Sequence, residues 1–145
     1  MINIVADMIY ADDMPYSLDD GQTLVRAARS AIELCIRSPR FDRGIVEKSI
    51  KRFCEPSGVF VTIEHYPTRT LRGRMGFAGP SGPLNRQLVG AAIAAASEDR
   101  HFAPLSIQEL GEVVIEVSIL GKHERIDAAP VRSVFAVLPP GVHRY

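Results

Sequence analysis

The segment 71–76, Leu-Arg-Gly-Arg-Met-Gly, most constrains the fold of this chain, because it places two glycines and two arginines where the flanking pattern predicts a β-strand. A glycine inside a strand gives up side-chain packing and marks a bulge, a bend or a close approach of another backbone. Arg72 and Arg74 are two residues apart, so both are expected on one face of the strand. The segment therefore predicts a tight backbone contact and a concentrated positive site.

Apolar residues at helical spacing predict two long helices. The first covers residues 20–37, and residues 17–20 ahead of it fit a capping box. The second follows Pro83, a residue suited to a first helical turn, and carries small residues on one face. Shorter helices are expected over residues 44–53 and after a second capping-box pattern at 106–109.

Strands are predicted where β-branched and aromatic residues cluster, or where apolar and polar residues alternate. The first two strands would be joined by a hairpin turn at 67–70, and residues 1–16 are expected to form an arm or a short edge element. Strands connected through helices and a hairpin predict an α+β fold, with a sheet that helices pack on one or both faces. The predicted strands cover residues 59–66, 71–77, 112–120 and 131–138.

Length and charge restrict the class of protein. With 145 residues the chain is expected to be a single domain over 1–145. No apolar run reaches the roughly 20 residues of a membrane span, and no basic segment precedes a leader-like stretch, so a cytoplasmic protein is expected. The formal net charge is zero, which argues against nucleic acid as the partner. A local basic patch of Arg69, Arg72, Arg74 and Arg86 is the weaker alternative.

Motifs for metals and cofactors are not recognised. Cys35 and Cys54 lack metal-ligand spacing and are expected to be free cysteines that pack as small hydrophobic residues. His65 and His101 have no companions at ligand or triad spacing, so structural or surface roles are expected. The Gly/Pro-rich segment 79–83 lacks the lysine of a phosphate-binding P-loop. The sequence therefore predicts no metal site and no bound cofactor.

Five segments, in the right order, resemble the AMMECR domain family, also called AmmeMemoRadiSam system protein A. The resemblance covers residues 17–120 and extends more loosely to His143. The segments are Leu-Val-Arg-Ala-Ala-Arg-Ser-Ala-Ile at 24–32, Gly-Val-Phe-Val-Thr at 58–62, Leu-Arg-Gly-Arg-Met-Gly at 71–76, Asp-Arg-His-Phe-Ala-Pro-Leu-Ser at 99–106 with Glu-Leu at 109–110, and Ile-Glu-Val-Ser-Ile-Leu at 115–120.

The resemblance implies an α+β fold with a central antiparallel sheet and a smaller subdomain. The family's biochemical activity is not established. In many prokaryotes the family accompanies a Memo-like protein and a radical S-adenosylmethionine protein, so these two are the implied partners in a shared pathway or complex.

Two departures from the family pattern are informative. The family usually has cysteine and isoleucine where this chain has Arg74 and Met75, and arginine offers no nucleophile, so a thiol mechanism at that position is excluded. The chain also ends where the family continues into further carboxyl-terminal elements. We therefore expect a minimal, divergent or truncated domain, in which exposed apolar surface could favour a homodimer.

The candidate ligand-binding residues are Arg72, Gly73, Arg74, Gly76, Glu116 and Ser118. Two arginines, exposed backbone N–H groups and the amino terminus of the following helix would together suit a small anion. The alternative for Arg72 is an internal ion pair with Glu116 or Glu64 on a neighbouring strand. For Arg74 the alternative is a solvated edge charge that discourages strand aggregation.

Two functions from different classes follow from these residues. The first is a module that binds a partner or a small ligand in the pathway that the resemblance implies. The second is an enzyme that acts on a small anionic substrate through the Arg72/Glu116 face, with Glu116 as the candidate acid or base. No catalytic residue is assigned from the sequence.

Overall fold

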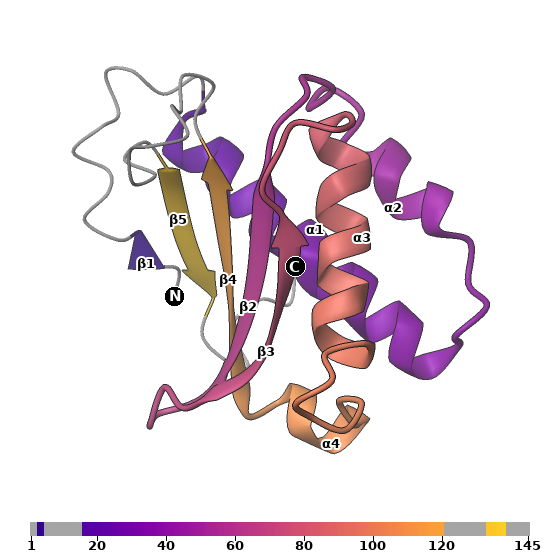
Figure 1. Cartoon of the computed structure of the whole chain (residues 1–145), viewed down its shortest axis with the longest axis vertical. Helices are drawn as coiled ribbons and strands as arrows, with labels where there is room; N and C mark the ends of the chain where they lie inside the picture. Colours follow the sequence, from indigo (N-terminus) through magenta and orange to yellow (C-terminus); the bar gives the residue numbers. More distant parts are fainter. Residues whose placement is uncertain (1–2, 5–15, 121–132, 139–145) are drawn as a thin grey trace.

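An antiparallel sheet with the strand order β1-β5-β4-β2-β3 forms the centre of the computed structural model (Figure 1). The structure describes residues 3–4, 16–120 and 133–138. The predicted α+β class and the antiparallel sheet are confirmed, whereas most of the predicted amino-terminal arm lies outside the described residues. The strands are β1 (Asn3–Ile4), β2 (Val59–His65), β3 (Leu71–Phe77), β4 (Val113–Leu120) and β5 (Ser133–Leu138).

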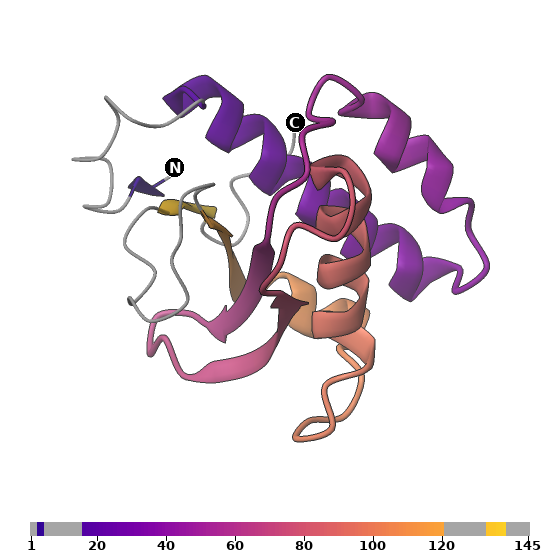
Figure 2. The same cartoon turned by 45° about the horizontal axis from the view of Figure 1, so that its top comes forward.

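Two long helices cover one face of this sheet (Figure 2). Helix α3 (Leu84–Ser97) packs on β2 and β3, and α1 (Leu18–Arg37) packs on β4 and β5 and against α3. The short helix α2 (Arg43–Ser49) packs against both, and α4 (Ile107–Leu110) contacts α1. The opposite face of the sheet carries none of these helices.

Side-chain caps set the start of three helices. Ser17 accepts from the backbone N–H of Asp20, while the Asp20 carboxylate accepts from that of Ser17, so the predicted capping box is confirmed. Ser106 and Glu109 form the second predicted box at α4. Helix α2 begins at the Asp42 cap and ends at Ser49, which is earlier than predicted.

The core lies between the sheet and the two long helices. Alternate residues of β2, namely Val59, Val61 and Ile63, are fully buried, and the alternate residues of β4 that start at Val113 are buried as well. Each fully buried aliphatic side chain contributes about 1.5–3 kcal/mol. Period-2 alternation in the strands and period-3.6 spacing in the helices therefore meet in a single apolar layer.

The two strand glycines allow the close approaches that the sequence predicts. A Cβ atom on Gly73 would lie 2.3 Å from the backbone oxygen of Ala95, so α3 approaches β3 more closely than any side chain would permit. A Cβ on Gly76 would lie 2.3 Å from the backbone oxygen of Val59 in the neighbouring strand. Both glycines therefore have a packing role.

Candidate functional site

A register shift in the β2–β3 hairpin sets the direction of Arg72. Ile63 lies opposite Gly73, but the next residue, Glu64, lies opposite Leu71, so Arg72 is the extra residue of a bulge. A bulge of this kind can re-aim a side chain. The Arg72 side chain reaches α4 and the loop before it, and only about a tenth of it is exposed (10%).

Arg72 is bound on several sides. Its Nε donates to Glu109 Oε2 at 2.9 Å and its Nη2 donates to Glu109 Oε1 at 3.0 Å. Nη2 also lies 3.4 Å from the carbonyl oxygen of Pro104, and the guanidinium carbon is 5.7 Å from the centre of the Phe102 ring. The guanidinium of Arg72 therefore directs its planar set of donors at groups of the protein itself and not at a ligand.

The internal ion pair of Arg72 is therefore present, but its partner differs from both predicted candidates. Glu64 pairs with Arg69 in the hairpin, and Glu116 lies opposite Thr62 in β2. The capping box of α4 holds Glu109 in place, because Ser106 donates to the same carboxylate. The hydrogen bonds from Arg72 are the largest cause of a lowered pKa for Glu109, about 2 instead of 4.5, although partial burial opposes that shift.

The Arg74 side chain has different contacts from that of Arg72. Arg74 lies opposite Thr62, and its guanidinium carbon is 4.6 Å above the centre of the Phe60 ring. Its backbone N–H donates to Asp99 Oδ2 at 2.9 Å, which satisfies a donor on the edge of the sheet. The expectation that Arg72 and Arg74 share one face of a regular strand is wrong, because Arg72 is the extra residue of the bulge and the two guanidiniums have different partners.

The other candidate residues divide in the same way. Gly73 lies beneath α3, on the helix-covered side of the sheet. In register, Thr62 of β2 separates Arg74 from Glu116, and Phe60 separates Gly76 from Ser118. The structure thus brings Arg74, Gly76, Glu116 and Ser118 to neighbouring positions across three strands and leaves Arg72 and Gly73 apart from them.

The predicted anion site at the start of α3 is not open. The backbone N–H of Leu84 donates to the carbonyl oxygen of Glu55 at 3.0 Å, and that of Asn85 donates to Phe53 at 2.9 Å. The next two N–H groups donate to the carbonyl oxygen of Pro83. The donors that would hold an anion at a helix amino terminus are already occupied by the preceding backbone.

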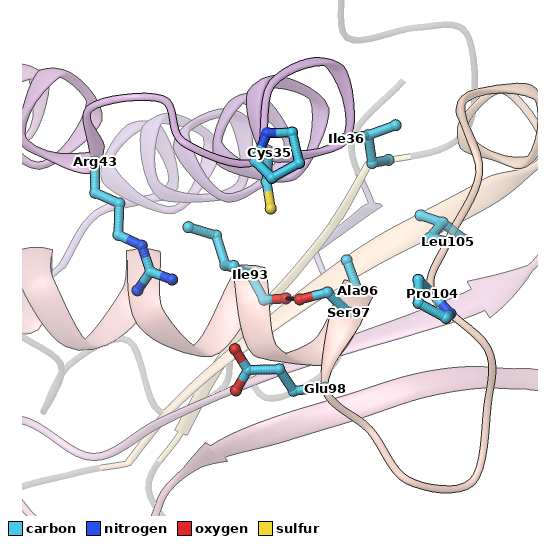
Figure 3. A pocket seen from close by; sticks show the side chains of 10 residues that line it. Cys35, Ile36, Arg43, Ile93, Ala96, Ser97, Glu98, Pro104 and Leu105 are labelled. Atoms are coloured by element: carbon cyan, nitrogen blue, oxygen red, sulfur yellow. Dashed lines mark hydrogen bonds between the residues drawn. The ribbon is translucent and has the colours of Figure 1, made fainter.

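A pocket of about 360 Å³ lies elsewhere, between the end of α1, the start of α2, the end of α3 and the segment before α4 (Figure 3). Most of its wall is apolar, and a thiol, a guanidinium and a carboxylate also face it. Pockets of this size and mixed lining commonly hold small molecules. The lining residues are Cys35, Ile36, Pro39, Arg43, Ile93, Ala96, Ser97, Glu98, Pro104 and Leu105.

The charged groups of the pocket have opposite signs. Among the described residues, neither the Arg43 guanidinium nor the Glu98 carboxylate has a side-chain hydrogen bond or an ion pair. Both act on the thiol of Cys35. Burial raises the pKa of Cys35, Arg43 lowers it and Glu98 raises it, with a net upward shift that keeps the thiol protonated.

The sequence did not indicate this pocket. Cys35 is half-buried and packs against the core, as predicted, but it also lines the pocket, whereas Cys54 is exposed and the packing prediction is wrong for it. Both cysteines are free. Arg43 and Glu98 are far apart in sequence and belong to no shared pattern, so only the packing of α1, α2 and α3 brings them to one cavity.

The described residues hold neither a metal-binding cluster nor a membrane-spanning helix. Within residues 3–4, 16–120 and 133–138, no three His, Cys, Asp or Glu side chains gather in a way that could hold a metal ion. In the same part of the chain, no helix combines the length and the apolar character that a membrane crossing requires.

One family model and several archaeal proteins match this chain. The family model AMMECR1 matches residues 25–143. The protein Ta0236 of Thermoplasma acidophilum is 38% identical over 118 residues, which is 81% of this chain and 56% of that protein. A protein of Thermococcus gammatolerans is 42% identical over 113 residues, covering 76% of this chain and 55% of its own length.

A solved structure is similar as well. The crystal structure of the uncharacterized protein PH0010 from Pyrococcus horikoshii superimposes with a TM-score of 0.62 at 36% identity, covering 70% of this chain and 51% of that chain. The chain spans about half the length of the curated relatives it matches.

Proposed function

The chain belongs to the AMMECR1 family, and on this premise we propose that it is a cytoplasmic binding module that takes a small ligand and works beside a Memo-like protein and a radical S-adenosylmethionine protein. One observation carries the ligand-binding part of this proposal, namely the pocket of about 360 Å³ at the ends of α1 and α3. The partners follow from the family alone.

The chemistry of the pocket favours reversible binding. Its apolar wall removes ligand surface from water, while Arg43 and Glu98 offer charged contacts that no described side chain occupies. The raised pKa of Cys35 keeps its sulfur in the thiol form, which is a poor nucleophile. The cysteine therefore serves as part of the wall.

The alternative enzyme at the Arg72/Glu116 face has less support. Arg72 directs its donors at Glu109 and Pro104, and Glu116 lies opposite Thr62 on the next strand. A substrate anion would have to displace a two-point ion pair before it could use Arg72. A binding role at the pocket requires no such rearrangement.

The ligand-binding part can be tested with the protein's own two thiols. We expect a pocket ligand to slow the alkylation of Cys35 by iodoacetamide, measured by peptide mass spectrometry, because the ligand would cover the sulfur. Cys54 is exposed and outside the pocket, so its alkylation is the internal control. If a wide panel of small metabolites, tested at millimolar concentration, leaves the rate at Cys35 unchanged, this part of the proposal fails.

The partner part needs a separate experiment. The tagged chain should retain a Memo-like protein, or a radical S-adenosylmethionine protein, from the same genome when the two are produced together. Circular dichroism of the same preparation establishes that the bait is folded. Failure of both proteins to bind a folded bait would contradict the proposed pathway link and leave the ligand test unaffected.

A further inference from the structure

We infer that the pocket between α1, α2 and α3 takes a small zwitterion with an apolar side chain, such as leucine or methionine, whose carboxylate meets Arg43 and whose ammonium group meets Glu98. This inference rests on the proposed ligand-binding function and names its ligand class. It follows from three features of the pocket: two opposite charges, an apolar end and a neutral thiol.

The two charges select for a ligand that carries both signs. A simple anion would gain from Arg43 but would be repelled by Glu98, and a simple cation would meet the reverse situation. Both groups line the same pocket, and neither has an ion-pair partner within 4.0 Å among the described residues. A zwitterion offers an acceptor to the guanidinium and donors to the carboxylate at the same time.

The pocket is also polarised along its length. In Figure 3, Arg43 lies at one end and Ile36, Pro104 and Leu105 lie at the other, while Glu98 lies below Ile93, nearer to Arg43 than the apolar end does. Ile93 and Ala96 of α3 form the floor between the two ends. An amino acid has the same division, with its charges on one carbon and its apolar side chain extending away from them.

The third feature is the thiol on the wall. The Cys35 sulfur points into the space above Ile93 (Figure 3). A protonated thiol behaves as a small, polarizable apolar group, so it adds contact surface and no charge. The pocket thus presents one positive, one negative and several apolar contacts, which together match a zwitterion that carries an aliphatic side chain.

The test compares three forms of one side chain: leucine, leucinamide and N-acetyl-leucine. At about pH 6.5 free amino groups are protonated and carboxylates are ionised, so these ligands are a zwitterion, a cation and an anion. We expect leucine to bind the unmodified chain tightest in isothermal titration calorimetry. Each capped form should bind about tenfold more weakly, since it loses one charge-assisted contact.

Two charge-removing variants locate the contacts. Arg43→Gln should weaken leucine and N-acetyl-leucine about tenfold but strengthen leucinamide, because the repulsion between two positive charges is removed. Glu98→Gln should weaken leucine and leucinamide about tenfold but strengthen N-acetyl-leucine for the same reason. Arg40→Gln is the matched control, because Arg40 lies close to Arg43 in sequence but does not line the pocket. The control should bind all three ligands like the unmodified chain.

The outcomes separate this inference from the function on which it rests. Equal affinity for the three ligands, or equal losses in all three variants, would overturn the zwitterion assignment. If no amino acid binds but another metabolite protects Cys35 from alkylation, the ligand class is wrong and the binding function stands. If nothing in the panel protects Cys35, both fail.

Discussion

Arg72 and Glu109 form a two-point ion pair that ties the edge strand β3 to the short helix α4, with donor–acceptor distances of 2.9 and 3.0 Å. The Arg72 side chain is largely buried, the Glu109 side chain is partly exposed, and the pair joins a bulge in the sheet to a capping box. Because Glu109 satisfies the donors of a largely buried guanidinium, the pair contributes to the stability of the fold.

Replacement of Arg72 by alanine should lower the free energy of unfolding by about 2 kcal/mol, between the values typical of exposed and of fully buried ion pairs. The loss arises because Glu109 keeps its charge but loses its main partner. Chemical denaturation followed by circular dichroism measures this change.

Arg74→Ala is the matched control for that experiment. Arg74 is exposed and its side chain stacks on Phe60, so its removal should cost less than about 1 kcal/mol. An equal decrease in the free energy of unfolding in the two variants would show that the Arg72–Glu109 pair contributes no more to stability than the exposed Arg74 side chain.

The Arg72–Glu109 pair also predicts how the free energy of unfolding depends on pH. The pKa of Glu109 is about 2 in the folded chain, whereas an ordinary glutamate, as in the unfolded chain, has a pKa of 4.5. As the pH falls, the Glu109 carboxylate is therefore protonated first in the unfolded chain. The stabilisation is complete above about pH 4.5 and is lost as the pH decreases toward 2. The slope of unfolding free energy against pH should therefore be smaller in Glu109→Gln over this window.

Some dependence of the unfolding free energy on pH is still expected in Glu109→Gln. The pKa of Asp99 is also lowered, first by the backbone N–H of His101 and then by that of Arg74. Asp99 remains in the Glu109→Gln variant and continues to titrate. A slope identical to that of the unmodified chain would contradict the role assigned to Glu109.

Local signals predicted most of the fold. The capping boxes at Ser17 and Ser106 involve neighbours in sequence, and the alternation in β4 depends only on residue order, so both can be recognised without the tertiary structure. The strands were predicted from residue patterns, and the antiparallel arrangement of the sheet followed from the family resemblance. The end of α2 was missed because Ile50 and Phe53 keep helical spacing and are buried, although the helix stops at Ser49.

The candidate site was less predictable, because it depends on contacts between distant segments. A single extra residue at Arg72 breaks the rule that residues two apart share a face of a strand. The strand glycines left a bulge open as one alternative, but no local pattern identifies Arg72 as the extra residue. Glu109 was identified as a cap, and its second role toward Arg72 appears only when α4 is placed beside β3. The pocket likewise needs the packing of three helices.

Gly73→Ala tests the close approach of α3 to the sheet. The added Cβ would lie 2.3 Å from the backbone oxygen of Ala95, so the helix or the strand must move, and we expect a loss of about 1–3 kcal/mol or more in unfolding free energy. Gly79→Ala is the control, since a Cβ there meets nothing within 4 Å and should change stability by less than about 1 kcal/mol. Similar losses at both positions would refute the steric explanation.

Asp99 protects the edge of the sheet, and its removal should be visible at a single amide. Its Oδ2 accepts from the backbone N–H of Arg74 at 2.9 Å, while its Oδ1 accepts from that of His101 at 2.9 Å. In Asp99→Ala we expect faster hydrogen exchange at the Arg74 amide, measured by NMR, because this donor then faces solvent. The amide of Leu105, which donates to the carbonyl oxygen of Ala96, is the internal control and should keep its rate. Unchanged exchange at Arg74 would mean that Asp99 does not cover the edge of β3, whereas faster exchange at both amides would indicate a general loosening of the loop after α3.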